Sequence, residues 1–323
     1  MFKRMLSAFG VGGPSVDTVL DSPHATPGGA VTGQVRIQGG SNDVEIGQVV
    51  LSLVTRVEVE HGDHEGHGTA EFHRVVVAQA VKVAAGQLLP VPFQLQIPWE
   101  TPLTAVGSTH LHGMTVGVRT ELVIAGAPDK GDLDPISVHP LPSQDRVLDA
   151  FGALGFQFRK ADVEAGRLHG VPQDLGFYQE IEFFPPQQYA GRLNQVELTF
   201  VANPHELYVV LEADKRGGMF SSGGDSFGHF ALPHREAEAT DWTSVVGQWL
   251  TQVVERGGQH GFGGHGQQGF GGHGYDDHDH HGRRGPGMGA VVGGVAAGVV
   301  GGMVLGEVFE EVGESFAFED EGE

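Results

Sequence analysis

The amino-acid sequence predicts an all-β fold of two tandem β-sandwich domains, followed by a low-complexity tail. Between residues 16 and 139, short segments with alternating apolar and polar side chains recur between turn residues, and the pattern resumes after residue 156. Such alternation places every second side chain on one face, as expected of half-buried strands that pack on a second sheet. After Arg256 the composition changes abruptly to glycine and histidine, which ends the predicted globular part.

Three segments of the first domain show the alternation most clearly. Their apolar positions are Val49, Leu51, Leu53, Val57 and Val59, then Val91, Phe93, Leu95 and Ile97, then Met114, Val116, Val118, Leu122 and Ile124. The interleaved polar residues, Ser52, Arg56 and Glu58 among them, are therefore expected on a solvent-exposed face. Turns rich in glycine separate the strands, as at residues 26–29 and 38–42.

The boundary between the domains is predicted at a helical linker, residues 146–155, which follows two prolines. The domains are accordingly assigned to residues 1–142 and 143–256. The second domain is expected to repeat the architecture of the first, with strands at 156–163, 179–184, 196–201 and 207–214.

A helix is predicted at each end of the globular part. Residues 1–10 form a short amphipathic helix with Phe2, Met5, Leu6 and Phe9 on one face, and their apolar run is too short and broken for a signal peptide. Residues 240–256 place Trp242, Val245, Val246, Trp249, Leu250, Val253 and Val254 at helical spacing. Thr240 or Asp241 can cap the start of this second helix, and Gly257 and Gly258 can end it. We expect it to dock on the domain core, with partner binding as the alternative.

The composition excludes several classes of function. The chain has 19 basic and 41 acidic residues, and its formal net charge of -22 repels nucleic acid and anionic lipid at long range. It has no cysteine, which excludes disulfides, thiolate metal sites and a cysteine nucleophile. We therefore expect a cytoplasmic protein that does not bind nucleic acid.

The predicted tail has two parts. Residues 257–287 form a Gly/His-rich linker that is expected to be disordered, because it offers little apolar surface to bury. Residues 288–323 contain a glycine-zipper segment and an acidic end. The spacing of Gly294, Gly298, Gly302 and Gly306 suits close packing of helices. Three interpretations stay open: a helix that pairs with copies of itself, a segment that inserts into or contacts a membrane, and a disordered linker.

No motif in the sequence indicates catalysis or cofactor binding. Two glycine patterns, at 261–266 and 269–274, match a dinucleotide fingerprint but lack the strand and helix that the fingerprint needs. The pattern Gly224-x-Ser226-x-Gly228 likewise lacks the α/β context of a nucleophile elbow. The carboxylates give no acid/base pair, since most are predicted on solvated strand faces. We expect no catalytic residue, no cofactor and no enzyme activity.

Histidines are the remaining candidates for metal binding, because the chain has 18 of them. His273, His278, His280 and His281 lie among aspartates in the tail and could bind a transition metal loosely. A second group, His61, His64 and His67, is predicted in a solvated hairpin loop without a catalytic metal.

An ordered succession of short segments resembles the bacterial sporulation-control family, the sporulation stage-zero M proteins. It begins with Phe2-Lys3-Arg4-Met5-Leu6 and residues 16–20, and continues through 27–29, 33–35, 51–56, 91–98, 118–124, 129–132, 147–150 and 179–183. The resemblance covers roughly residues 1 to 255 and stops before the tail.

The resemblance implies two arrestin-like sandwiches and a role in the onset of sporulation, or in a related developmental or division programme, through protein contacts. The family supplies no catalytic residues to carry over. The leading hypothesis is a cytoplasmic adaptor or scaffold that binds proteins of unknown identity through sheet edges, strand addition included, or an inter-domain groove. The alternative is a membrane-associated structural protein that oligomerises or inserts through its glycine zipper.

Overall fold

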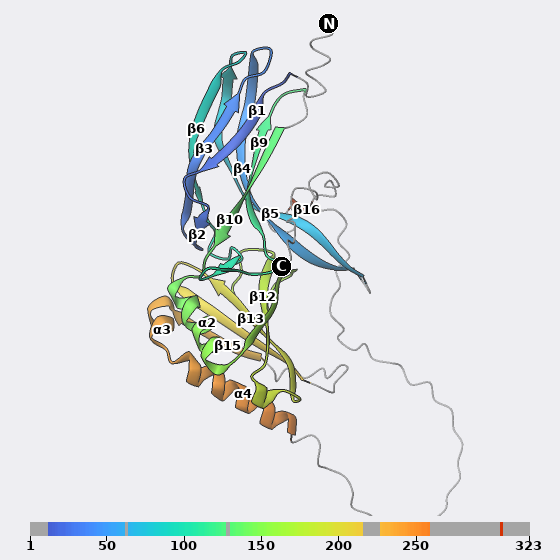
Figure 1. Ribbon diagram of the computed structural model, residues 1–323, viewed down its shortest axis with the longest axis vertical. Coiled ribbons are helices and arrows are strands. Elements are labelled where there is room, and N and C mark those ends of the chain that lie inside the picture. Colours follow the sequence, from blue (N-terminus) through green and yellow to red (C-terminus); the bar gives the residue numbers. More distant parts are fainter. Residues whose placement is uncertain (1–11, 62–63, 127–129, 216–226, 259–303, 306–323) are drawn as a thin grey trace, which may run out of the picture.

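Strands dominate the computed structural model, which describes residues 12–61, 64–126, 130–215, 227–258 and 304–305. Figure 1 shows a β-rich N-terminal half and a C-terminal half in which helices flank a sheet. The prediction of a β-rich chain is confirmed. The predicted division between residues 142 and 143 stays a prediction, although helix α2 (Pro142–Leu154) begins at that point.

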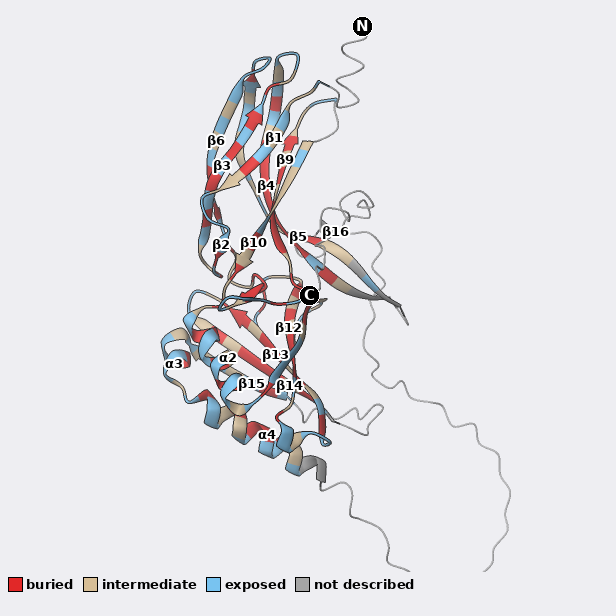
Figure 2. Ribbon diagram, in the orientation of Figure 1, coloured by how far each residue is buried: buried red, intermediate tan, exposed pale blue. Residues whose placement is uncertain are grey.

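The N-terminal half is a sandwich of two sheets. The first sheet has the strand order β1-β3-β6. The second sheet has the order β4-β9-β10-β2, and β5 pairs with the other edge of β4. The strands are β1 (Ser15–Leu20), β2 (His24–Ala25), β3 (Ala30–Gln38), β4 (Val44–His61), β5 (His64–Val83), β6 (Leu88–Gln96), β9 (Val116–Val123) and β10 (Lys130–Val138). Burial alternates strictly along β3, with Val31, Val35 and Ile37 inside (Figure 2). A small hairpin of β7 (Ala105–Val106) and β8 (Thr109–His110) follows β6.

The apolar positions predicted for this sandwich are confirmed as its core. Val49, Leu51, Leu53 and Val57 of β4 are fully buried, and so are most of those predicted on β6 and β9. One expectation is wrong: Ser52 is completely buried rather than exposed. The reason is its place on a central strand, where Arg74 and Arg119 lie directly opposite it on the two neighbouring strands. The side chain of Val59 lies outside the described part of the structure.

Strands β4 and β5 form a long hairpin whose far end projects from the sandwich (Figure 1). The sequence suggested a loop around His61, His64 and His67, but β4 runs to His61 and β5 begins at His64. The loop prediction is wrong because all three histidines lie in the strands: His61 pairs with His64, and His67 pairs with Glu58. Two tail residues, β16 (Val304–Leu305), pair with β5, so this end of the predicted glycine zipper is extended.

The C-terminal half is a five-stranded sheet in the order β15-β14-β13-β12-β11. The strands are β11 (Gln157–Ala165), β12 (Phe177–Phe184), β13 (Leu193–Ala202), β14 (Glu206–Lys215) and β15 (Phe227–Pro233), with a short η1 (Gln187–Tyr189) between β12 and β13. The predicted strands are confirmed to within a few residues. Unlike the N-terminal half, this sheet carries helices along one side: α2, α3 (His234–Ala239) and α4 (Trp242–Gly258) (Figure 1).

These helices cover the sheet because their apolar stripes must be buried. On α2, the ring of Phe151 lies 4.4 Å from that of Phe156 and 4.7 Å from that of Phe183. The prediction that residues 240–256 form a docked helix is confirmed, since its buried residues are Trp242, Val246, Trp249, Leu250 and Val253. Asp241 caps the start, where its Oδ1 accepts a hydrogen bond of 3.1 Å from the Ser244 amide.

Side chains hold the two halves together at their junction. The amide of Gln179 on β12 acts like an extra strand partner, because its Oε1 accepts from the Leu103 amide and its Nε2 donates to the Leu103 carbonyl, each at 2.8 Å. The ring of His234 lies 5.7 Å from that of Trp99 in the N-terminal half, and hydrogen bonds to Ser143 and to the Asn203 carbonyl hold it in place within the C-terminal half. The sheets also join directly, through the pairing of β4 with β11.

Several predictions fall outside the described residues. These are the N-terminal helix at 1–10, the Gly/His-rich linker beyond residue 258, the acidic end at 306–323 and the glycine zipper apart from its two paired residues. They stay predictions.

Candidate functional site: an acidic sheet face

One face of the C-terminal sheet is lined by carboxylates. Because neighbouring residues of a strand point to opposite faces, Ile181 and Phe183 face the helices while Glu180 and Glu182 face away from them. The cross-strand register extends this second face over four strands, with one residue of β4 at its border. We call it the acidic face, and its carboxylates are Glu58, Asp162, Glu164, Glu180, Glu182, Glu197, Glu212 and Asp214.

The register places like charges directly opposite one another on the acidic face. Glu182 of β12 pairs with Glu197 of β13, which in turn pairs with Glu212 of β14. Asp162 of β11 pairs with Glu180 of β12. Directly opposite side chains have Cβ atoms only about 5 Å apart, so each like-charge pair costs folding free energy. Stability alone therefore does not account for this arrangement.

Two basic side chains at one end of the face offset part of the charge. The Nζ of Lys160 lies 2.6 Å from Asp162 Oδ2 and 3.1 Å from Glu182 Oε1. The Nη1 of Arg159 lies 2.9 Å from Glu182 Oε2, and it also donates to Gln195. The carboxylate of Glu182 is thus paired with cations, whereas Glu180 lies further along the strand.

The electrostatic consequence is a set of acids that hold their protons near neutral pH. Burial, followed by the charges of Glu197 and Asp162, raises the pKa of the Glu180 carboxyl to about 8. Burial and the charge of Glu197 raise the pKa of the Glu212 carboxyl to about 7. The pKa of Glu197 is raised by burial too, although a hydrogen bond from Gln195 opposes the shift. Strongly perturbed acids that share one surface mark a candidate functional site.

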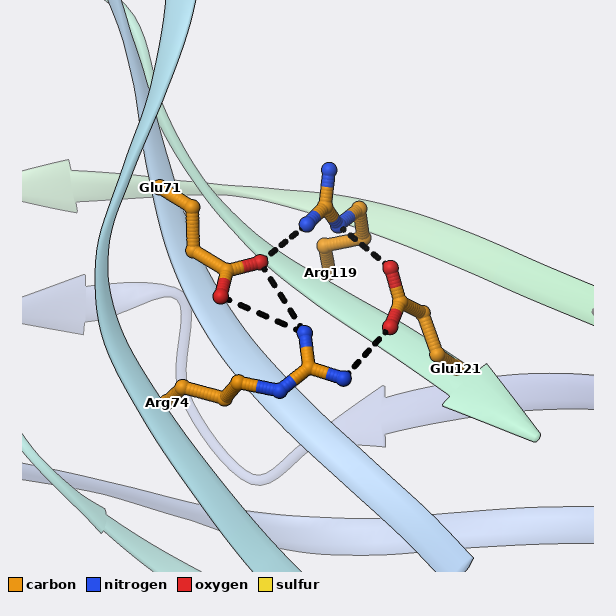
Figure 3. Close-up of polar contacts among 4 residues, drawn as sticks. All are labelled: Glu71, Arg74, Arg119 and Glu121. Atoms are coloured by element: carbon orange, nitrogen blue, oxygen red, sulfur yellow. Dashed lines mark hydrogen bonds and ion pairs between the residues drawn. The ribbon is translucent and has the colours of Figure 1, made fainter. Parts of the chain in front are cut away.

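A second charged cluster, in the N-terminal half, is balanced and serves as a contrast. Glu71 and Arg74 of β5 meet Arg119 and Glu121 of β9 above the central strand β4 (Figure 3). Arg119 pairs with both glutamates, and Arg74 also reaches both, at 3.2 Å and 3.0 Å. This charge network, as we call it, has two cations and two anions and lies over the buried Ser52, so it has a structural role.

A group of three carboxylates could hold a metal ion. One carboxylate oxygen from each of Glu58, Asp162 and Glu164 lies within 4.8 Å of the others. The group lies where β4 of the N-terminal half meets β11 of the C-terminal half.

The structure leaves most of the sequence-predicted sites untested. His273, His278, His280 and His281, proposed for loose metal binding, lie outside the described residues, as do Gly294, Gly298, Gly302 and Gly306 of the glycine zipper. The same holds for both dinucleotide-like patterns and for Gly224 and Ser226. Gly228 is described: it lies in β15, where a Cβ would come within 2.9 Å of the Trp249 ring. This glycine is thus explained by helix packing.

The acidic face was missed by sequence reasoning, which assigned these carboxylates to ordinary solvated strand faces. The available signal was the recurrence of acids at every second position, as in Asp162-x-Glu164, Glu180-x-Glu182 and Glu212-x-Asp214. Alternation alone does not reveal which strands are neighbours, and only the register shows that the acids face one another.

Comparison with known proteins identifies the family. The family model described as SpoOM protein matches residues 2–217, which is well over half of the chain. The chain belongs to the SpoOM family. A relative, the sporulation-control protein spo0M of Bacillus subtilis (strain 168), is 33% identical over 216 residues, which cover 67% of this chain and 81% of the relative. The predicted resemblance is confirmed.

A solved SpoOM structure confirms the fold class. The crystal structure of Spo0M, a sporulation control protein from Bacillus subtilis, matches with a TM-score of 0.64 and 28% sequence identity. The match covers 76% of this chain and 100% of the crystallised chain. The arrestin-like, β-rich fold class expected from the sequence is therefore confirmed, although helices take the place of a second sheet in the C-terminal half. Among the described residues, no helix is long and apolar enough to cross a membrane.

Proposed function

We propose that this protein is a non-enzymatic adaptor in the cytoplasm that controls sporulation onset, or a related developmental or division programme, by binding a basic segment of a partner protein on its acidic face. The name of the Bacillus subtilis relative supports the sporulation role. The contact mechanism rests on one observation, the like-charge ladder Glu182–Glu197–Glu212 across three adjacent strands.

Lysine or arginine side chains would relieve the repulsion that the ladder creates. A basic segment laid across the strands would bring positive charge between acids that are half-buried and already destabilised. Phe227, which is 51% exposed, lies opposite Glu212 at the border of the face and adds apolar contact area. Aromatic residues are enriched at protein interfaces.

The first experiment tests function in a cell. This chain is expressed in Bacillus subtilis that lacks its own Spo0M, and heat-resistant spores are counted. We expect the wild-type chain to restore the count and the triple variant E180Q/E197Q/E212Q to fail. The matched control E45Q/E238Q/E255Q removes three exposed glutamates elsewhere and should restore it fully. Equal activity of the triple variant and the control would exclude the acidic face as the site.

The second experiment tests direct contact. A photo-crosslinking phenylalanine analogue is placed at Phe227 on the acidic face or, as a control, at Leu88, which is 57% exposed in the N-terminal half. We expect a crosslinked partner from position 227 only, and we expect this crosslink to be lost in the triple variant.

A third experiment tests the proposal that the protein is not an enzyme. The variant Ser226→Ala should leave the spore count unchanged, and a lower spore count would indicate catalysis.

A further inference from the structure

The group Glu58, Asp162 and Glu164 has features that the protein-binding proposal does not explain. Glu58 and Glu164 lie directly opposite each other, and theirs is the residue pair through which β4 and β11 join the sheets of the two halves. Asp162 precedes Glu164 by two positions and therefore points to the same face. The fold thus gathers three carboxylates at the junction of the halves.

Asp162 carries an independent sign of a missing ligand. Its side chain is 9% exposed, and its Oδ2 accepts a hydrogen bond of 2.6 Å from Lys160 Nζ. Its Oδ1 is buried without a hydrogen-bond partner among the described residues. A buried carboxylate oxygen without a partner costs the full loss of its hydration, so native structures rarely leave one unsatisfied.

We propose that Glu58, Asp162 and Glu164 bind a calcium ion that ties β4 to β11. Carboxylate oxygens are the ligands that calcium prefers, and its flexible coordination by six to eight oxygens allows water to complete the shell. Zinc would favour nitrogen or sulfur ligands, and magnesium demands a nearly ideal octahedron. The Oδ1 atom of Asp162 gains its missing partner, and the ion is coordinated by carboxylates from both halves.

The neighbouring ammonium group sets the strength of the site. Lys160 remains bound to Asp162 Oδ2 and to Glu182, so it reduces the negative charge that the ion experiences. We therefore expect weaker binding than three carboxylates without a neighbouring cation would give. The ion would stiffen the junction of the two halves, and this role does not depend on the partner proposed above.

The test measures calcium binding by calorimetry on the full-length chain after treatment with a chelator. The variant D162N/E164Q removes two charges from the site, and E45Q/E238Q removes two exposed charges elsewhere as a matched control. We expect one calcium ion per chain in the wild type and in the control, with affinity at least tenfold weaker in D162N/E164Q. Binding elsewhere, for example by the acidic tail, would be equal in all three proteins. Equal affinity in D162N/E164Q and the control, or no calcium binding, overturns the proposal.

Thermal unfolding gives a second readout that does not depend on the double variant. With a few millimolar calcium chloride, the wild type should gain stability by mass action and E164Q should gain less. The same experiment with magnesium chloride should give a smaller shift. If calcium raises the melting temperatures of both proteins equally, the ion binds elsewhere and the proposal fails.

Discussion

Carboxylates lie on neighbouring strands both in the charge network of the N-terminal half and on the acidic face of the C-terminal half, but the residues opposite them differ. In the network, Glu71 and Glu121 each meet both Arg74 and Arg119. On the acidic face, Glu197 lies between two other glutamates. The network opposes unlike charges, whereas the ladder opposes like charges, which Arg159 and Lys160 offset at its Glu182 end.

The difference separates structural charge from functional charge within one fold. Both clusters lie on sheets with a well-packed apolar core beneath them, so burial alone does not distinguish them. What distinguishes them is whether the register opposes unlike or like charges. A sheet that aligns negative charges across three strands presents a surface that is electrostatically complementary to a cationic partner.

The largest expected effect comes from breaking the network. The side chain of Arg119 is only 17% exposed and pairs with both Glu71 and Glu121. Arg119→Ala removes this largely buried cation from both glutamates, so the free energy of unfolding should fall by about 2–3 kcal/mol. Arg74→Ala is the matched control, because its side chain is 45% exposed and should cost about 1 kcal/mol or less. Urea denaturation measures both. Equal losses would show that the network is not organised around Arg119.

The next effect is a fall in stability as the pH rises. The pKa values of Glu180 and Glu212 in the folded chain, about 8 and about 7, exceed their ordinary value of 4.5. Between these limits the folded state binds more protons than the unfolded chain, so the free energy of unfolding decreases with increasing pH. We expect a loss of roughly 2 kcal/mol between about pH 5 and about pH 8.5, after allowance for solvent screening.

The variant E180Q/E212Q shows which part of this loss belongs to the acidic face. Its pH dependence should be flatter than that of the wild type but not absent, because the pKa of Asp134 in the N-terminal half is also raised, to about 7. Denaturation curves at several pH values measure the slope. An unchanged slope in the double variant would mean that these two carboxyls titrate normally.

A third prediction applies the same chemical change to both regions and expects opposite signs. Glu197→Gln removes the middle charge of the ladder and should raise the free energy of unfolding at pH 8 by about 0.5–1 kcal/mol. Glu71→Gln removes the charge that Arg74 and Arg119 share and should lower it by about 1–2 kcal/mol. If both variants change stability in the same direction, the distinction between the regions is wrong.

The sequence allowed prediction of those features that depend on local patterns. Period-two burial identified Leu51, Phe93 and Val118 as core, and helical spacing identified the docked face of α4 from Trp242 to Val253. The burial of Ser52 and the ladder through Glu197 could not be predicted, because both depend on which strands are neighbours and in what register. A one-residue shift of register would move every acid to the other face.

The smallest effect is the response to salt, and its sign tests the comparison directly. Raising sodium chloride from about 0.1 M to about 1 M shortens the screening length from about 10 Å to about 3 Å. This weakens attraction in the charge network and repulsion on the acidic face together. Because the acidic face has the larger unbalanced charge, we expect the wild type to gain a few tenths of a kcal/mol. The variant E180Q/E197Q/E212Q retains the network but loses most of the repulsion, so salt should leave its stability unchanged or lower it. A wild-type response that persists unaltered in this variant would mean that the repulsion arises elsewhere on this strongly acidic chain.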